Sequence, residues 1–173
     1  GTISTPRKEA DKVKILSGVK DGYAEGTPIC MVIENTNVHS KDYFELEHTA
    51  RPGHADYTAH IKYDGYEDPR GGGHFSGRLT APIVACGAVA LSMLKAKGIT
   101  IGTHIQSLHG IQDAHFTQDN LSAQIASLNE KQFPVLDDAQ GSKMIEEIEK
   151  ARMAQDSVGG VLQTVILGLE PGI

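Results

Sequence analysis

The residues that could do chemistry in this sequence gather between Arg51 and Arg78. Glycine allows a ligand to approach the backbone closely, arginine can clamp a phosphate or carboxylate group, and histidine can transfer a proton near neutral pH. The combination indicates a site for a small anionic molecule that undergoes proton-coupled chemistry. Besides a run of glycines at 71–73, the segment contains Arg51, His54, Asp56, His60, Arg70, His74 and Arg78.

Each part of this cluster also has a simpler structural interpretation. A single histidine or arginine is often a surface or packing residue, and a run of glycines often marks an ordinary loop. The run at 71–73 lacks the lysine of a P-loop and the spacing of a dinucleotide fingerprint, so nucleotide binding of those types is not supported. The functional interpretation therefore depends on the density of the cluster.

Two central segments resemble the chorismate synthase family. The first, HTARPGHADYT, contains the RPGHAD block of that family. The second, IKYDGYEDPRGGGHFSGRLTAPIVACGAVA, follows its pattern of a glycine-rich loop, a serine and an arginine separated by one small residue, and a helix of small residues. The resemblance extends to STPRKEADKV, GTPICMVIENTN and DSVGGV, and so spans essentially the whole chain.

This resemblance implies a lyase of the shikimate pathway. Its reaction removes phosphate and a ring hydrogen from 5-enolpyruvylshikimate 3-phosphate by 1,4-elimination to give chorismate. It requires reduced FMN although there is no net redox change, so a flavin reductant is an implied partner. Members of the family are homotetramers, but the resemblance leaves the oligomeric state of this chain open, and the composition indicates a cytoplasmic protein. Two alternatives remain open: a non-catalytic anion- or flavin-binding module, and a structural domain in which the same side chains serve packing.

The resemblance also assigns roles to individual residues. His54 would be an acid–base group that lies against the flavin, and the backbone of Gly77 would line the flavin. The substrate would contact Arg7, Arg51, Ser76 and Arg78. Many family members have Arg-Ser ahead of this serine, Ala between it and the arginine, and a glutamate next. This chain has His74-Phe75, Gly77 and Leu79 instead. We expect His74 to replace a missing guanidinium in part.

An apolar segment over 80–98 follows the site directly. Thr80 is suited to cap a helix there, and Pro82 is tolerated in a first helical turn. Small and apolar residues occur all round this helix, so we expect it to be buried. Its N-terminus would favour an anion beside Ser76 and Arg78.

Composition narrows the class of protein. A net charge of −6 argues against a general binder of nucleic acid or anionic membranes. We expect no membrane span, because no segment approaches the about 20 apolar residues that one requires, and we expect no signal peptide at the start of the sequence. Cys30 and Cys86 lie in apolar runs and are expected to be buried, reduced thiols. No metal site is expected, because the histidines at 104, 109 and 115 lack the close spacing of a zinc site.

The ends of the sequence match internal positions of the family pattern. Family members are longer, with an N-terminal GESHG-type block and a C-terminal portion that this sequence does not contain. We therefore expect an internal piece of the enzyme that is inactive alone.

Hydrophobic patterns predict one α+β domain over residues 1–173. The strands are expected to be mostly antiparallel with helices layered on the sheet, and the resemblance implies a layered β-α-β sandwich with buried helices. The polar segment 35–48 is expected to be a surface excursion or lid, and His104 to lie on the more polar face of its strand. The predicted strands are 13–19, 29–33, 99–108 and 161–169, and the further helices are 119–132 and 139–155.

Overall fold

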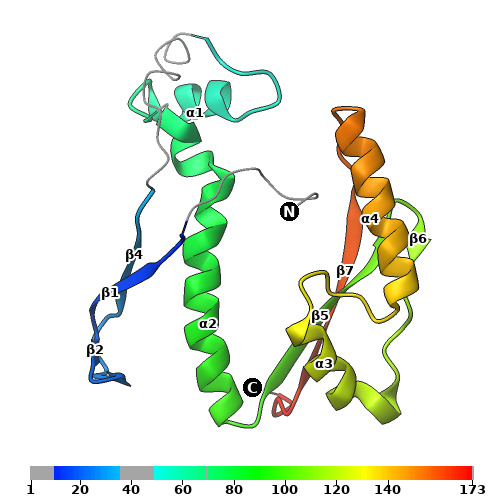
Figure 1. The fold of residues 1–173 in the computed structure, drawn as a ribbon. Helices are drawn as coiled ribbons and strands as arrows, with labels where there is room; N and C mark the ends of the chain where they lie inside the picture. Colours follow the sequence, from blue (N-terminus) through cyan, green and yellow to red (C-terminus); the bar gives the residue numbers. More distant parts are fainter. Residues whose placement is uncertain (1–9, 36–48, 69, 173) are drawn as a thin grey trace. The chain divides into compact units, whose positions relative to one another are not determined.

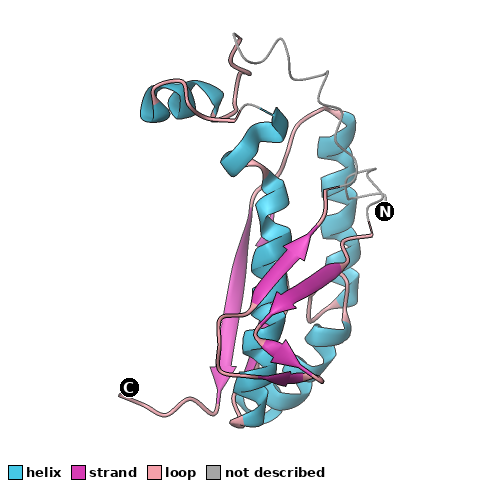
Figure 2. Cartoon of the chain, turned by 90° about the vertical axis from the view of Figure 1, so that its left-hand side faces the viewer, coloured by secondary structure: helices cyan, strands magenta, loops and turns pink. Residues whose placement is uncertain are grey.

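The computed structural model describes residues 10–35, 49–68 and 70–172 (Figure 1). The chain divides into two compact units, which are described separately: an N-terminal unit, Lys8–Val89, and a C-terminal unit, Ala90–Ile173 together with Gly1–Arg7. Within the described ranges every strand pair is antiparallel, and helices accompany strands in both units (Figure 2). The predicted α+β class is therefore confirmed. From residue 36 onward, the predicted excursion lies outside the described residues.

The N-terminal unit begins with two antiparallel strand pairs. The first and last strands pair with each other, and two short strands pair between them. Gly18 separates the pairs with a φ of 80°, and a Cβ there would lie 2.6 Å from the carbonyl oxygen of Pro28. Only glycine fits, because it has no Cβ and adopts positive φ without strain. The strands are β1 (Val13–Ser17), β2 (Val19–Lys20), β3 (Tyr23–Ala24) and β4 (Cys30–Ile33).

Short helices carry the candidate site of this unit. The helix α1 (Asp56–Tyr63) ends at Asp64, whose φ of 52° is left-handed. The glycine-rich segment, which the resemblance describes as a loop, forms two 3-10 helices, η3 (Arg70–Phe75) and η4 (Gly77–Leu79). These tight turns give the backbone a defined helical conformation before the long helix.

The long helix α2 (Thr80–Ala96) begins without the cap that the sequence predicts. η4 runs directly into it, and the hydroxyl of Thr80 donates to the carbonyl oxygen of Gly77 at 2.7 Å instead of accepting from the helix. The capping oxygen comes from Ser76, whose Oγ accepts from the N–H of Arg78 at 3.2 Å. The N-terminus of the helical stretch therefore lies at η4, next to the serine.

The prediction that this helix is buried is wrong for this chain. None of the residues of α2 is buried, and Ile83 and Val84 are 69% and 70% exposed. Apolar residues on every face predict burial, but burial also needs a neighbouring element, and no other described helix or strand packs extensively along α2. For the same reason Cys86 on α2 is exposed, as is Cys30 on β4, contrary to the prediction of buried thiols.

By length and composition alone, the helical stretch Gly77–Ala96 could cross a membrane. The prediction that no segment reaches the length of a membrane span is therefore wrong by this criterion. One such helix is weak evidence for a membrane protein, because core helices of soluble proteins pass the same test.

The C-terminal unit is built on a three-stranded antiparallel sheet in the order β6-β5-β7. β5 and β7 pair along most of their length, from Thr100 opposite Leu167 to Leu108 opposite Gly160. The helices α3 and α4 lie along this sheet (Figure 1). The strands are β5 (Thr100–Leu108), β6 (Ile111–Gln112) and β7 (Gly160–Leu167), and the helices are η5 (Gln118–Asn120), α3 (Leu121–Glu130) and α4 (Asp138–Met153).

The core of this unit forms where β5, α4 and the segment before α4 meet. Leu108, Val135 and Met144 are its buried cluster, and Met144 is completely buried. Gly141 allows α4 to approach closely, since a Cβ there would lie 2.6 Å from Cγ2 of Val135. On α3, Ile125 and Leu128 are buried.

His104 lies in the interior of this unit, so the prediction that it occupies the polar face of its strand is wrong. The side chain is completely buried; Nδ1 lies 2.6 Å from Oδ2 of Asp113, and Nε2 lies 2.9 Å from Oε1 of Gln163. The ring of Phe116 packs edge-on, with 4.7 Å between ring centroids. A buried polar side chain needs such partners, and they come from other segments of the chain.

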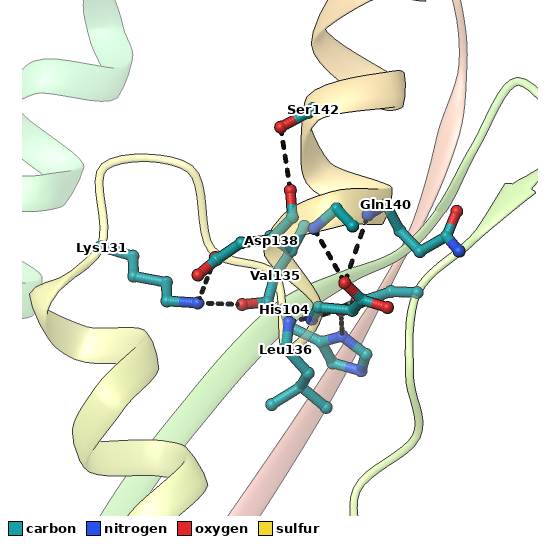
Figure 3. A network of polar contacts seen from close by, with 10 residues as sticks. His104, Lys131, Val135, Leu136, Asp138, Gln140 and Ser142 are labelled. Atoms are coloured by element: carbon teal, nitrogen blue, oxygen red, sulfur yellow. Dashed lines mark hydrogen bonds and ion pairs between the residues drawn. The ribbon is translucent and has the colours of Figure 1, made fainter.

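Asp113 extends this network to the start of α4. Its carboxylate accepts from the N–H groups of Leu136 at 2.7 Å and Asp137 at 2.8 Å. Figure 3 shows His104 next to this segment and Lys131 beside it, where the ammonium group donates to the carbonyl oxygen of Val135 at 2.8 Å. The network therefore ties β5 to the loop that begins α4.

Replacing Asp137 with alanine is expected to lower the free energy of unfolding by about 1 kcal/mol. Asp137 is the N-cap of α4, and its Oδ1 accepts from the N–H groups of Ala139 at 2.8 Å and Gln140 at 3.4 Å. Urea denaturation followed by circular dichroism measures the change. Asp137→Asn retains an acceptor and should recover most of the loss, whereas an unchanged alanine variant would show that the cap contributes nothing.

Candidate functional site

The RPGHAD sequence folds into a turn that leads into α1. Pro52 and Gly53 occupy its centre, and the N–H of His54 donates to the carbonyl oxygen of Arg51 at 3.3 Å. Gly53 has a φ of 71°, the positive value that a type II turn requires at this position. Because the chain reverses here, Nη2 of Arg51 lies 3.2 Å from Nδ1 and 3.4 Å from Nε2 of His54.

Asp56, the first residue of α1, contacts both of these side chains. Its Oδ2 accepts from Nε of Arg51 at 2.7 Å and from the backbone N–H of Arg51 at 3.0 Å, and its Oδ1 accepts from Nη2 at 2.8 Å. The same Oδ1 lies 2.7 Å from Nδ1 of His54. Arg51, His54 and Asp56 thus form one group, named here the RPGHAD cluster.

The RPGHAD cluster is partly accessible to a ligand. The side chains of Arg51 and His54 are 31% and 30% exposed, and that of Asp56 is 16% exposed. The hydrogen-bonding guanidinium of Arg51 holds the pKa of Asp56 well below its usual range, against the opposing effect of burial. Near neutral pH the cluster therefore presents a guanidinium and an imidazole around an ionised carboxylate.

Ser76, Gly77 and Arg78 form a second group at the start of η4. The side chain of Arg78 is 27% exposed, and its Nη2 lies 2.6 Å from Oδ1 of Asp11. A Cβ added to Gly77 would meet no atom within 4 Å, so the backbone there is open to approach. A guanidinium beside open backbone suits an anionic ligand.

The predicted site residues fall into these two groups. The described contacts bring Arg51 together with His54, and Ser76 together with Arg78. Arg7 lies outside the described residues. The assignment of these residues to substrate and flavin stays a prediction.

Two carboxylates contact the arginines of the candidate site, and the sequence did not predict these contacts. Asp56 holds Arg51 through two side-chain hydrogen bonds, and Asp11 pairs with Arg78. An arginine and an aspartate five residues apart, across a Pro-Gly turn, could have indicated the first pair. No local signal indicates the second, because its partners lie far apart in the sequence.

Other histidines of the segment stay apart from the RPGHAD cluster in the described contacts. Nδ1 of His60 lies 3.0 Å from Oε1 of Glu67, and His74 lies edge-on to the ring of Phe75 in η3. Across the described ranges, no group of three or more histidine, cysteine, aspartate or glutamate residues could hold a metal ion.

The fold and the site together define an α+β protein in which a guanidinium, a carboxylate and an imidazole contact one another at a partly exposed position. The chain belongs to the chorismate synthase family, whose profile matches residues 1–173. This confirms the family that the sequence motifs predict.

Individual relatives agree with this assignment. The chorismate synthase of Thermococcus kodakarensis is 44% identical over 171 residues, which cover 99% of this chain and 46% of the relative. The chorismate synthase of Pyrococcus abyssi is 44% identical over 172 residues, with the same shares covered. The chain thus spans about half the length of the relatives it matches. A crystal structure of chorismate synthase aligns with 92% of this chain and 44% of its own chain, at a TM-score of 0.65 and 24% identity, which shows a shared fold.

Proposed function

We propose that this chain supplies acid–base and anion-binding residues of a chorismate synthase. The proposed reaction removes phosphate and a ring hydrogen from 5-enolpyruvylshikimate 3-phosphate to give chorismate, and requires reduced FMN. The observation that carries the proposal is the RPGHAD cluster. In this cluster a guanidinium, a carboxylate and an imidazole contact one another, within a chain that matches the family over its whole length.

The arginines are proposed to hold the phosphate and carboxylate groups of the substrate. A guanidinium can donate paired hydrogen bonds to either group and neutralises the phosphate as it leaves. Arg51 and Arg78 already contact Asp56 and Asp11, so an incoming anion would share each guanidinium with a carboxylate. The proposed substrate-binding residues are Arg7, Arg51, Ser76 and Arg78.

The donors of the site fit reduced FMN in their chemistry. The partly exposed imidazole of His54 can hydrogen-bond to a polar edge of the flavin and move a proton there. The open backbone at Gly77, where a Cβ would meet no atom within 4 Å, leaves room for a flat ring to line it. When bound, reduced flavin would supply an electron transiently and recover it, so that the reaction has no net redox change.

The proposal includes a cellular setting. We propose a cytoplasmic homotetramer that obtains reduced flavin from a separate reductant and has no nucleic-acid or membrane partner. The net charge of −6 supports the absence of a nucleic-acid partner, because such partners require a surplus of positive charge at their binding surface.

A chimeric enzyme tests this function. It carries residues 1–173 in place of the matching segment of the Thermococcus kodakarensis relative, of which the chain covers 46%. With photoreduced FMN and 5-enolpyruvylshikimate 3-phosphate under anaerobic conditions, we expect chorismate and phosphate to form in equal amounts. Chorismate absorbance and a phosphate assay measure the two products, and the unmodified relative is the positive control.

Two other outcomes would contradict the proposal. A folded chimera that binds FMN stoichiometrically without turnover would favour a non-catalytic anion- or flavin-binding module. A folded chimera that neither binds FMN nor forms product would favour a structural role for the arginines and histidines.

A further inference from the structure

We infer that Asp56 is the positioning residue of this site: it selects which ring nitrogen of His54 carries the proton and anchors Arg51. This inference rests on the acid–base role proposed for His54. Asp56 itself would touch neither substrate nor flavin, and would act through its two neighbours.

The contact between Asp56 and His54 selects one tautomer of the imidazole. Oδ1 of Asp56 lies 2.7 Å from Nδ1 of His54. Nη2 of Arg51 lies 3.2 Å from the same Nδ1 and 3.4 Å from Nε2, so the guanidinium and the carboxylate compete for the ring. An ionised carboxylate can only accept and a guanidinium can only donate, so the shorter contact with the carboxylate favours a hydrogen on Nδ1 and leaves Nε2 as the acceptor for Nη2. A neutral imidazole carries one ring hydrogen, and Nε2 therefore keeps its lone pair. Nε2 is then the atom of His54 that can take a proton from a ligand and return it.

Arg51 holds the carboxylate in the orientation that this contact needs. Both oxygens of Asp56 accept from Arg51, through Nε at 2.7 Å, Nη2 at 2.8 Å and the backbone N–H at 3.0 Å. Paired hydrogen bonds from a planar guanidinium prevent the carboxylate from rotating. Bonding by the guanidinium also holds the pKa of Asp56 well below its usual range, so the carboxylate stays ionised and keeps accepting.

The two charged groups that the described contacts place against His54 come from different elements. Arg51 precedes the Pro-Gly turn, and Asp56 begins α1. Asp56 therefore orients the imidazole of His54, and the guanidinium of Arg51 holds the carboxylate of Asp56 in place. Arg51 therefore has a role at His54 in addition to the substrate contact proposed for it.

Nitrogen-15 NMR of the histidine-labelled chain tests this inference at alkaline pH, where imidazole rings are neutral. In the wild-type chain we expect the Nδ1–H tautomer of His54 to exceed the Nε2–H tautomer by about tenfold, because a charge-assisted hydrogen bond favours it. In Asp56→Asn this excess should fall by roughly threefold or more, since a neutral acceptor forms a hydrogen bond about half as strong.

His60 serves as an internal reference in the same spectra. It lies in α1 and contacts Glu67, so its signals report whether α1 remains folded in the Asp56→Asn chain. The matched control is Glu67→Gln, which should shift the signals of His60 and leave the tautomer ratio of His54 unchanged.

Two results would overturn the inference. One is a wild-type chain in which His54 carries its hydrogen mainly on Nε2. This result would overturn the inference even if the Asp56→Asn chain failed to fold. The other is a folded Asp56→Asn chain with an unchanged tautomer ratio. The measurement needs neither flavin nor substrate, so it can fail while the chimeric enzyme turns over, and it can succeed while that enzyme is inactive.

Discussion

Replacing Asp113 with alanine is expected to lower the free energy of unfolding by about 3–5 kcal/mol, because it leaves several buried polar groups without their shared acceptor. The side chains of Asp113 and His104 are completely buried against each other. The same carboxylate accepts from the N–H groups of Leu136 and Asp137. Without this carboxylate, the imidazole of His104 and two backbone N–H groups lose their acceptor in the protein interior. Each buried group without a hydrogen-bond partner lowers the free energy of unfolding further.

Urea denaturation of the alanine variant measures this effect, with circular dichroism as the signal. The matched control is Asp138→Asn, which removes an exposed carboxylate that pairs with Lys131 on the surface. That change should alter the stability by less than about 1 kcal/mol, because exposed ion pairs contribute little. If both variants lost the same amount, the buried network would have no special role in the C-terminal unit.

The contribution of Asp113 should also depend on pH. Burial raises the pKa of Asp113. Hydrogen bonds from the backbone N–H groups of Leu136 and Asp137 and from His104 together lower this pKa by more, so it lies below the ordinary value of an aspartate. A carboxyl group whose pKa falls on folding stabilises the folded state above its unfolded pKa of about 4, and loses this contribution as the pH falls through its folded pKa. The stability difference between wild type and Asp113→Ala should therefore shrink below about pH 4.

Element positions were largely predictable from the sequence, because hydrophobic period and helix ends are local properties. The predicted strand 99–108 is β5, Thr100–Leu108, and the predicted helix 139–155 is α4, Asp138–Met153. The turn at Pro52 and Gly53 likewise has a local cause, because proline fixes its φ and glycine adopts a positive φ without strain.

Burial was harder to predict, because it depends on segments that are distant in the sequence. The alternation in β5 placed His104 with the polar residues, yet Asp113, nine residues later, gives it a buried partner. Asp113 in turn depends on Leu136, a further 23 residues along. The apolar pattern of α2 led to the opposite error, since a helix without a packed neighbour stays exposed whatever its composition.

The RPGHAD motif indicated which residues would matter, but not how they are connected. It predicted roles for Arg51 and His54 separately. Asp56 could orient the histidine only if the backbone brought the two side chains to one side, and the turn centred on Gly53 does this. The geometry of the turn therefore decides which side chains contact each other, and the residue types alone do not specify that geometry.

In the chimeric enzyme, His54→Gln is expected to lower kcat by about 100- to 10,000-fold, the usual contribution of a positioned acid–base group. Glutamine approximates the size of histidine and can still form a hydrogen bond, but it cannot gain or lose a proton near neutral pH. The loss should therefore appear mainly in kcat, with a smaller change in KM, because the arginines proposed to bind the substrate are unchanged. Anaerobic assays with photoreduced FMN at saturating substrate measure it.

His60→Gln is the matched control for this prediction. His60 lies in the same helix region, yet it pairs with Glu67 and takes no part in the RPGHAD cluster contacts. Its replacement should leave kcat within about threefold of the unmodified chimera, since surface substitutions have small effects. Equal losses in both variants would point to general damage to α1, and a His54→Gln enzyme with full kcat would remove His54 from the acid–base role. A selective loss at His54 would instead assign the proton transfer to the imidazole that Asp56 orients.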